Sequence, residues 1–129
     1  MSDKFIVEII TPDKSILKSE VHEVTIPSYE GQMGILKDHI SLITFLRPGI
    51  IVIRGFEEKK FYVEEGTVEF SNNNLLILTS TVKDLKELNQ SFIKDTLSHA
   101  EKKLSDNNYS DKEKYILSYK INTLKEISQ

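Results

Sequence analysis

The sequence predicts an N-terminal antiparallel β-sandwich at residues 1–82 followed by a C-terminal antiparallel α-helical hairpin at residues 83–129. Two observations indicate this division. Before Val82, short segments rich in β-branched residues alternate with turn residues, as in sandwiches and barrels. After Val82, apolar residues recur every three or four positions, the period of an amphipathic helix. All the glycines and prolines precede residue 67, so neither helix contains a breaker.

The predicted strands span residues 5–10, 15–20, 24–26, 40–46, 50–54, 59–63, 67–70 and 75–79. Pro12 and Asp13 predict the first turn, and the third strand is expected to end at Pro27. Residues 30–39 read as a loop between two buried strands, in which paired glycines permit a tight turn. Residues 71–74 predict a hairpin turn, because asparagine reaches the left-handed backbone region at low cost.

The apolar positions of the first helix are Leu85, Leu88, Phe92, Ile93, Leu97, Ala100 and Leu104, and those of the second are Ile116, Leu117, Ile121, Leu124 and Ile127. Asn89 is the predicted N-cap of the first helix, with Asp84 as an earlier alternative. Ser110 and Glu113 fit a capping box at the start of the second. A hairpin of this size is too small for its own core, so it should pack on the sandwich or on a partner.

The composition excludes several classes of protein. A chain of 129 residues with 39% apolar residues has the size of about one domain with a small appendage. A net charge of −3 with mixed signs is not typical of nucleic-acid binding, and the absence of cysteine fits a reducing compartment. There is no apolar run near the roughly 20 residues of a membrane span, nor a signal or transit peptide. Membrane association is therefore expected only through partner proteins.

No catalytic, cofactor-binding or metal-binding residue is predicted. His22, His39 and His99 are scattered without the spacing of a metal motif, and no nucleophile elbow is present. The paired acids at residues 57–58 and 64–65 flank hairpin ends, where carboxylates are expected to be solvated. Residues 31–34 lack the Lys-[Ser/Thr] of a phosphate-binding loop.

A family resemblance adds to this reading. The sequence Glu30-Gly31-Gln32-Met33-Gly34-Ile35, then His39 and Pro48-Gly49, is followed downstream by residues 61–70 and 75–79 in a characteristic order. Over essentially its whole length the chain resembles the epsilon subunit of F-type ATP synthases, called delta in mitochondria. The resemblance implies a non-catalytic central-stalk subunit that couples rotation of a proton-driven membrane ring to ATP synthesis. It also implies three partners, the gamma subunit, the membrane ring and the catalytic alpha/beta head, on the cytoplasmic face of a bacterial inner membrane.

The resemblance places the loop end of the sandwich on the polar loops of the membrane ring. The ring-contact candidates are Gln32, Lys37, Asp38 and His39. Relatives often carry Pro-Gly where this chain has Lys37-Asp38, and charge there predicts a more polar, salt-sensitive contact. The alternative is that the glycines of this stretch serve turn geometry alone.

The resemblance also implies that the helical tail is a movable arm that inhibits ATP hydrolysis by pressing on acidic loops of the head. The head-contact candidates are Lys94, Lys102, Lys103, Lys112 and Lys114, with Lys120 and Lys125 as further lysines of the tail. Acidic residues interleave with them, so the charge pattern itself does not indicate an acidic partner. The alternative is a hairpin folded down on the sandwich.

One departure concerns nucleotide binding. Some epsilon subunits bind ATP through an [Ile/Leu]-Asp-x-x-Arg-Ala motif, and residues 88–93 of this chain match its position. Asn89 occupies the position of the Asp and Phe92 that of the Arg, and no arginine follows Arg54. A neutral amide and a phenyl ring supply neither the charge nor the donor fork used for phosphate. We therefore predict no ATP site of that type.

Two other classes of function remain open from the residues alone. One is a free-standing β-sandwich adaptor that binds a helical partner, and the other is a small sandwich enzyme. Co-purification separates the three hypotheses: the stalk subunit requires a large membrane-bound assembly, the adaptor a soluble partner, and the enzyme turnover in isolation.

Overall fold

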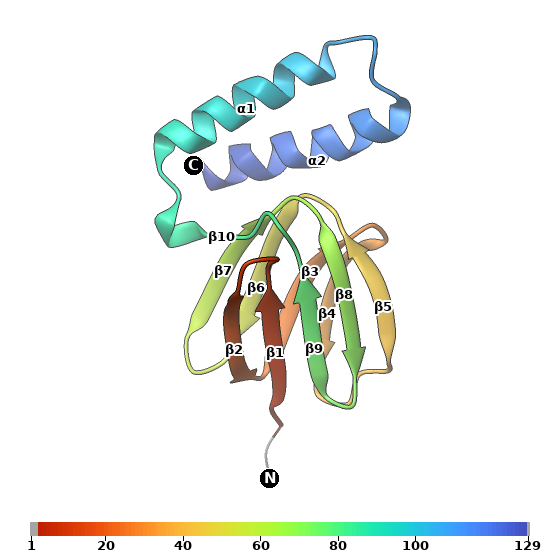
Figure 1. The fold of residues 1–129 in the computed structure, drawn as a ribbon, viewed down its shortest axis with the longest axis vertical. Helices are drawn as coiled ribbons and strands as arrows, with labels where there is room; N and C mark the ends of the chain where they lie inside the picture. The colour runs from red at the N-terminus through yellow and green to blue at the C-terminus, as the bar shows by residue number, and fades with distance from the viewer. Residues whose placement is uncertain (1–2, 129) are drawn as a thin grey trace.

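The structure is a computed structural model that describes residues 3–128. Two helices lie across one end of a β-sandwich, and the N-terminus lies at the opposite end (Figure 1). We call the end beside the helices the helix end and the opposite end the base. The predicted fold class, a β-sandwich followed by a helical hairpin, is confirmed.

Ten strands form one hydrogen-bonded sheet of order β10-β7-β6-β3-β5-β8-β9-β1-β2, with β4 paired to β3. The strands are β1 (Phe5–Ile10), β2 (Ser15–Val21), β3 (Glu23–Ser28), β4 (Gly31–Leu36), β5 (Leu42–Leu46), β6 (Gly49–Arg54), β7 (Glu58–Val63), β8 (Gly66–Ser71), β9 (Asn74–Leu78) and β10 (Lys83–Asp84).

The sheet folds into two layers because β3 changes partner along its length. Its first half pairs with β6 at Glu23–Thr25, and its last residue, Ser28, pairs with β5. The expected end of this strand at Pro27 is wrong, since Pro27 lies inside β3. A proline fits there because it needs no N–H partner between the two ladders. Gly49 is required opposite it, since a Cβ at Gly49 would lie 2.5 Å from the Cβ of Pro27.

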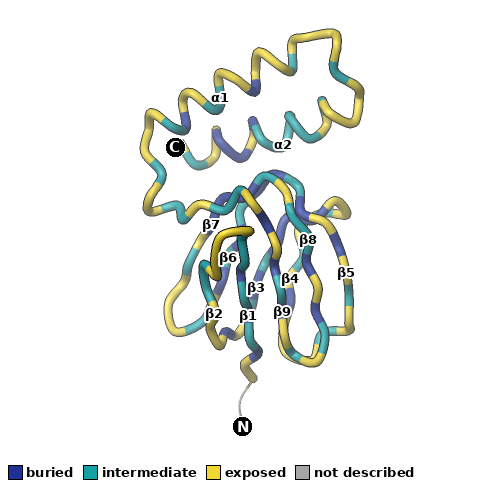
Figure 2. The backbone as a smooth tube through the Cα atoms, in the orientation of Figure 1, coloured by how far each residue is buried: buried dark blue, intermediate teal, exposed yellow. Residues whose placement is uncertain are grey.

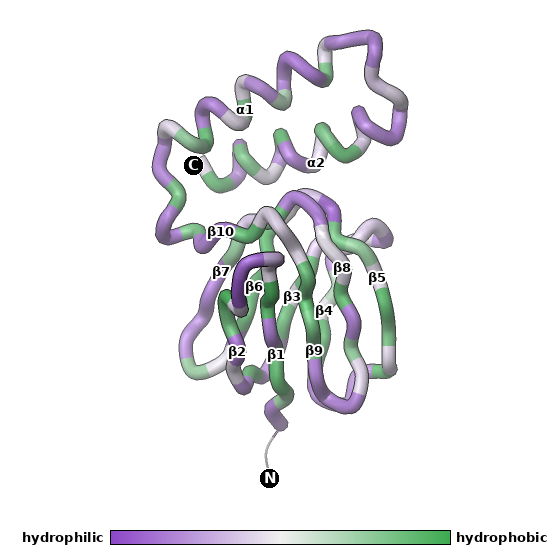
Figure 3. The backbone as a smooth tube through the Cα atoms, viewed as in Figure 1, coloured by the Kyte–Doolittle hydropathy of each residue, from purple (hydrophilic) through white to green (hydrophobic). Residues whose placement is uncertain are grey.

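Alternate strand residues fill the space between the layers. The buried core consists of Phe5, Val7, Ile9, Val21, Val24, Ile26, Ile35, Leu46, Ile51, Ile53, Phe61, Val63, Val68, Phe70, Leu75 and Ile77. Buried and apolar positions run along the strands in Figures 2 and 3, whereas the tip of the helical hairpin is exposed and hydrophilic. The core therefore belongs to the sandwich, and the hairpin is an addition at one end.

The stretch expected to be a loop at residues 30–39 is instead mostly strand β4. Gly31 opens it with a φ of 124°, next to a turn in which the Ser28 hydroxyl donates to the Gly31 carbonyl at 2.7 Å. Gly34 lies within the strand and pairs with Thr25. The prediction failed because two of the six residues of β4 are glycines, which favour turns, and only Met33 and Ile35 place apolar side chains on its inner face.

Two pairings depart from a simple antiparallel sandwich. β1 pairs with β9 in parallel, with Ile6 opposite Asn74, while its other edge is antiparallel to β2. After β9 the chain crosses the helix end and adds the two residues of β10 to the edge of β7. A short 3₁₀ helix, η1 (Leu85–Glu87), follows, and the Asp84 carboxylate accepts from the Lys86 amide at its start.

The helices are α1 (Gln90–Leu104) and α2 (Asp111–Ile127). The predicted caps are confirmed. The Asn89 side chain accepts from the Phe92 amide at 2.7 Å, and Ser110 and Glu113 form the capping box of α2. Each cap satisfies amides that a helix start leaves without partners, so both helix starts are specified locally.

Truncation tests whether the sandwich folds without the helices. A chain that ends at Leu88 keeps β10 and η1 on β7, so it should melt cooperatively with a β-type circular dichroism spectrum. A chain that ends at Thr81 should melt at a lower temperature, because it loses the strand that covers the edge of β7. Absence of a cooperative transition in the Leu88 chain would contradict the predicted division near residue 82.

Candidate interaction surfaces

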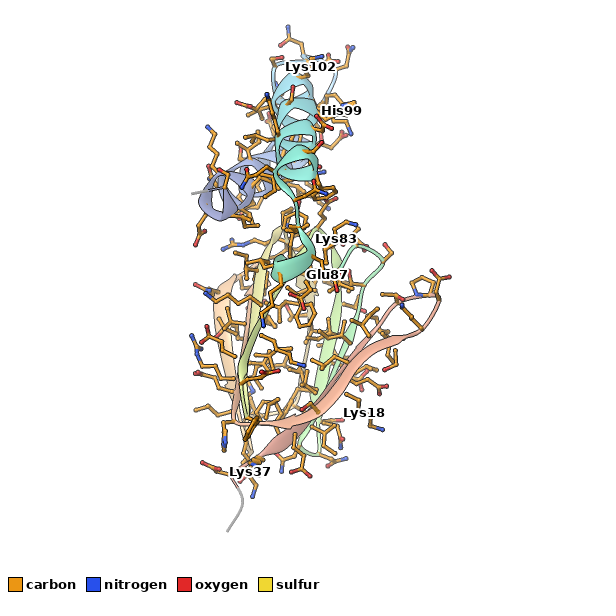
Figure 4. The ribbon with its side chains drawn as sticks, turned by 90° about the vertical axis from the view of Figure 1, so that its left-hand side faces the viewer. Lys18, Lys37, Lys83, Glu87, His99 and Lys102 are labelled. Carbon is orange, nitrogen blue, oxygen red and sulfur yellow. The ribbon has the colours of Figure 1, made fainter. Side chains whose placement is uncertain are left out.

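The ring-contact candidates do not gather in one place. Lys37, Asp38 and His39 form the turn between β4 and β5 at the base, where Figure 4 labels Lys37. Gln32 lies near the other end of β4, about 16 Å away at 3.3 Å per residue, and lines a groove with Tyr119 of α2. The structure therefore groups three candidates at the base and places the fourth beside the helical hairpin.

The base turn is held by hydrogen bonds within the protein. The His39 amide donates to the Leu36 carbonyl at 3.1 Å, and Asp38 has a φ of 66°. The Asp38 amide donates to the Asn73 side-chain oxygen at 2.7 Å, and the Asn73 side-chain nitrogen donates to the Asp38 carboxylate at 2.9 Å. The His39 ring lies edge-on to Phe70 of the core, with 6.0 Å between centroids. The turn is thus fastened to its neighbours.

A second surface is an apolar face on β5. Residues 40–46 were expected to form a buried strand, but β5 begins at Leu42 and turns Ile43 and Phe45 outward, 74% and 55% exposed. Tyr29 stacks beside Phe45 at 6.5 Å, and Leu78 is also exposed. An open groove of about 630 Å³ lies between Tyr29, Phe45, Leu78 and the start of the β1–β2 turn. Contiguous exposed apolar side chains of this kind mark protein–protein contact surfaces.

The helical hairpin packs on the helix end through a small apolar cluster. Tyr62 of β7, Ile93 of α1 and Leu124 of α2 are buried together. The Phe92 ring meets Tyr62 edge-on at 6.5 Å between centroids. Since Tyr62 is fully buried although it belongs to the sandwich, the hairpin covers a side chain that would otherwise face solvent.

Glu64 adds a polar contact to this cluster. Its carboxylate accepts from the Tyr62 hydroxyl at 2.9 Å and from the Lys120 ammonium of α2 at 3.2 Å. The expectation that acids at this hairpin end are solvated is wrong for Glu64, whose side chain is only 27% exposed. Burial, the Glu64 charge and the hydrogen bond to Glu64 together raise the pKa of Tyr62 far above its ordinary value. Tyr62 therefore stays neutral and donates.

A cation–aromatic contact lies on the same helix. The Arg47 guanidinium sits 3.9 Å above the ring of Tyr119, which meets Tyr115 edge-on at 4.8 Å between centroids. The hydrogen bond between the Tyr115 and Tyr119 hydroxyls raises the pKa of Tyr119, and the Arg47 charge opposes this rise. The Thr123 hydroxyl donates to the Tyr119 carbonyl at 2.7 Å and reaches the Pro48 carbonyl at 3.5 Å. α2, rather than α1, carries the polar contacts that dock the hairpin.

The head-contact candidates lie on α1 and on the first turn of α2. Lys94, Lys102, Lys103 and Lys112 are exposed, and Lys114 is half-buried. Figure 4 labels Lys102 near the tip of the hairpin. None of these five makes an ion pair with a carboxylate within residues 3–128. Lys120, another lysine of the tail, instead forms an ion pair with Glu64 at 3.2 Å.

The two residues that depart from the ATP-binding motif both have structural roles. Asn89 caps α1, and Phe92 packs on Tyr62 while the Lys83 ammonium lies 5.0 Å from its ring centroid. The absence of an ATP site of that type remains a prediction.

In the part of the chain that the structure describes, no helix is long and apolar enough to cross a bilayer.

Sequence reasoning missed two of these features. Glu64 directly follows β7, two positions after Tyr62, and only the position of α2 reveals its role. The outward apolar residues of β5 do carry a signal, since Ile43 and Phe45 alternate with Thr44 and Leu46. Because both faces contain apolar residues, the pattern resembles that of a strand buried on both sides.

Comparison with known proteins agrees with this architecture. A family model described as the β-sandwich domain of the ATP synthase delta/epsilon chain matches residues 4–84. The ATP synthase epsilon chain of Pelagibacter ubique is 46% identical over 99% of this chain and its own full length. The corresponding chain of Dichelobacter nodosus is 35% identical over 79% of this chain and 73% of its own.

Solved structures share the fold at lower identity. A chain of the Euglena gracilis mitochondrial ATP synthase, in a structure with OSCP, F1 and c-ring, superposes with a TM-score of 0.78. It is 20% identical and is matched over 99% of this chain and 81% of its own. A central stalk/c-ring structure of the Tetrahymena thermophila enzyme contains a chain with a TM-score of 0.66, 17% identity and 96% coverage of both chains.

A double-mutant cycle tests the docking role of Glu64. Glu64→Gln and Lys120→Gln should each lower hydrogen-exchange protection in α2, with a coupling energy of about 1 kcal/mol because the pair is partly buried. Lys125→Gln, which removes an exposed lysine of the same helix, should combine additively with Glu64→Gln. If the effects of Glu64→Gln and Lys120→Gln also proved additive, the ion pair would not be what holds the hairpin.

Proposed function

This chain belongs to the delta/epsilon family of ATP synthase subunits, and we propose that it is a non-catalytic central-stalk subunit of a proton-translocating enzyme. In this role it couples rotation of the membrane ring to ATP synthesis. The observation that carries the proposal is the length of the match, since a relative at 46% identity aligns with 99% of the chain, both sandwich and helices. If this chain were a free-standing adaptor, only its sandwich would need to resemble these relatives.

The surfaces divide among the three partners named by this role. The apolar face of β5, with Ile43 and Phe45, suits the gamma subunit, because two proteins that rotate together need a lasting, water-excluding contact. The base turn at residues 37–40 suits the polar loops of the ring. The exposed lysines of the hairpin suit the acidic loops of the alpha/beta head. The bacterial relatives favour a position on the cytoplasmic face of an inner membrane.

Pull-down of the tagged chain from solubilised membranes tests the proposal and the gamma surface together. The wild-type chain should recover gamma, ring and head subunits. Ile43→Asp with Phe45→Asp should lower recovery of gamma at least tenfold, because two charges would be buried without partners. Phe56→Asp is the matched control, since Phe56 is fully exposed on the β6–β7 turn and away from the groove.

Recovery of no ATP synthase subunit by the wild-type chain would overturn the proposed function. Normal recovery of gamma by the Ile43/Phe45 variant would instead overturn only the assignment of the apolar face.

The helical hairpin is proposed to restrain ATP hydrolysis. It has little core of its own and rests on the sandwich through Tyr62 and Glu64, so it can leave at modest cost. Once raised along the stalk, the exposed lysines, among them Lys102 and Lys103, would meet acids of the head. This arrangement would oppose rotation in the hydrolysis direction.

Removal of the helices tests this restraint. A complex whose copy of the chain ends at Leu88 should keep assembly and ATP synthesis but hydrolyse ATP faster than the intact complex. The difference should shrink at high salt, because screening weakens attraction between the lysines and acidic loops. Equal hydrolysis rates at matched salt and proton-motive force would leave the hairpin with a structural role alone.

A further inference from the structure

The base contains an unusual concentration of left-handed backbone. Within residues 3–128, the non-glycine residues with positive φ are Asp38, Asn72 and Asn73, at 66°, 51° and 58°. All three belong to two neighbouring turns, one between β4 and β5 and the other between β8 and β9. Such conformations cost energy, and they persist where the surroundings fix them, often at functional positions.

The two turns are fastened to each other by a reciprocal pair. The Asp38 amide donates to the Asn73 side chain at 2.7 Å, and the Asn73 side chain donates back to the Asp38 carboxylate at 2.9 Å. The Asn73 carbonyl accepts from the Ile6 amide at 3.1 Å, so Asn73 also ties in β1. One asparagine therefore joins three segments that are distant in sequence.

The position of Asp38 explains why this pair is needed. The Leu36–His39 turn places Asp38 at its third position, where a positive φ usually requires glycine and where proline is favoured at the position before. Aspartate reaches this region more easily than most residues but still at a cost. The two hydrogen bonds to Asn73 offset that cost, and they engage the carboxylate within the protein.

We propose that Asp38 is a positioning residue, and that its pairing with Asn73 holds the turns at residues 36–39 and 71–74 as one rigid contact surface. This inference rests on the proposed function, in which the base meets polar loops of the membrane ring. The side chains that reach the ring are those beside the pair, Lys37, Ile40 and Asn72, all of which are exposed. The charge of Asp38 is not itself part of the contact.

Four variants of the full chain separate position from charge. Asp38→Asn removes the charge but keeps a side-chain oxygen acceptor and a residue that tolerates positive φ. Asp38→Ala removes the acceptor and disfavours the turn, and Asn73→Ala removes the other half of the pair. Glu57→Gln is the control, because it removes one negative charge from another turn at the base.

Two measurements are needed for each variant. Hydrogen exchange at the amide of residue 38 reports the pair in the isolated chain. Retention on membranes that carry the ring, stripped of their own copy of this subunit, reports the contact. Retention of Asp38→Asn and Glu57→Gln on the membranes should be within twofold of that of the wild type. Asp38→Ala and Asn73→Ala should lose hydrogen-exchange protection at residue 38. Their retention on the membranes should be about tenfold lower, because the hydrogen bonds that fix the contact geometry are lost.

Each contrary result has a distinct meaning. Equal loss of retention for Asp38→Asn and Asp38→Ala, with protection intact in Asp38→Asn, would overturn the positioning role in favour of a charge contact. Normal retention of Asp38→Ala and Asn73→Ala despite lost protection would overturn the joined turns as the contact surface. Failure of the wild-type chain itself to bind these membranes would overturn the proposed function instead.

Discussion

The architecture depends on one strand that pairs with two different neighbours. β3 leaves β6 and joins β5 at Ser28, and this change folds a continuous sheet into two layers that enclose the core. Pro27 and Gly49 meet at the crossing, one without an N–H and the other without a Cβ. The Arg47 amide donates to the Pro27 carbonyl at 3.0 Å, so the crossing also places Arg47 beside α2. The helix end is built around this point.

Local rules predicted the parts of the chain that local forces determine. The helices, their caps at Asn89 and Ser110, and the asparagine turn between β8 and β9 follow from periodicity and side-chain hydrogen bonding over a few residues. The misassigned parts are those where a pairing overrides the local signal. β4 forms a hairpin with β3 although its two glycines favour a turn, and Pro27 is tolerated because β3 changes ladders beside it. Only the second of these depends on residues distant in sequence.

The candidate surfaces also differ in whether neighbouring residues alone could predict them. Residues 37–39 could be placed together from the sequence, because three consecutive residues of a turn remain together in any fold. Gln32 could not, since its distance from Lys37 depends on whether the intervening residues are loop or strand. Glu64 belongs to the docking contact only because α2 brings Lys120 to it from 56 positions away. Tyr62 is buried by both helices, so the tail supplies the surroundings of this sandwich residue.

The parallel pairing of β1 with β9 has a consequence for the order in which the chain folds. Ile6 lies opposite Asn74, so the first strand waits for a partner made some seventy residues later. Contacts of such long sequence separation slow folding, because the entropy of closing the loop is lost before the contact forms. During synthesis, β1 and β2 can form only a hairpin whose two outer edges are open, until β9 covers the edge of β1. Within residues 3–128, the outer edge of β2 stays open even in the finished sheet. Lys14 and Lys18 are exposed in the turn before β2 and on β2, and charged side chains at an open edge discourage strands of other chains from pairing with it.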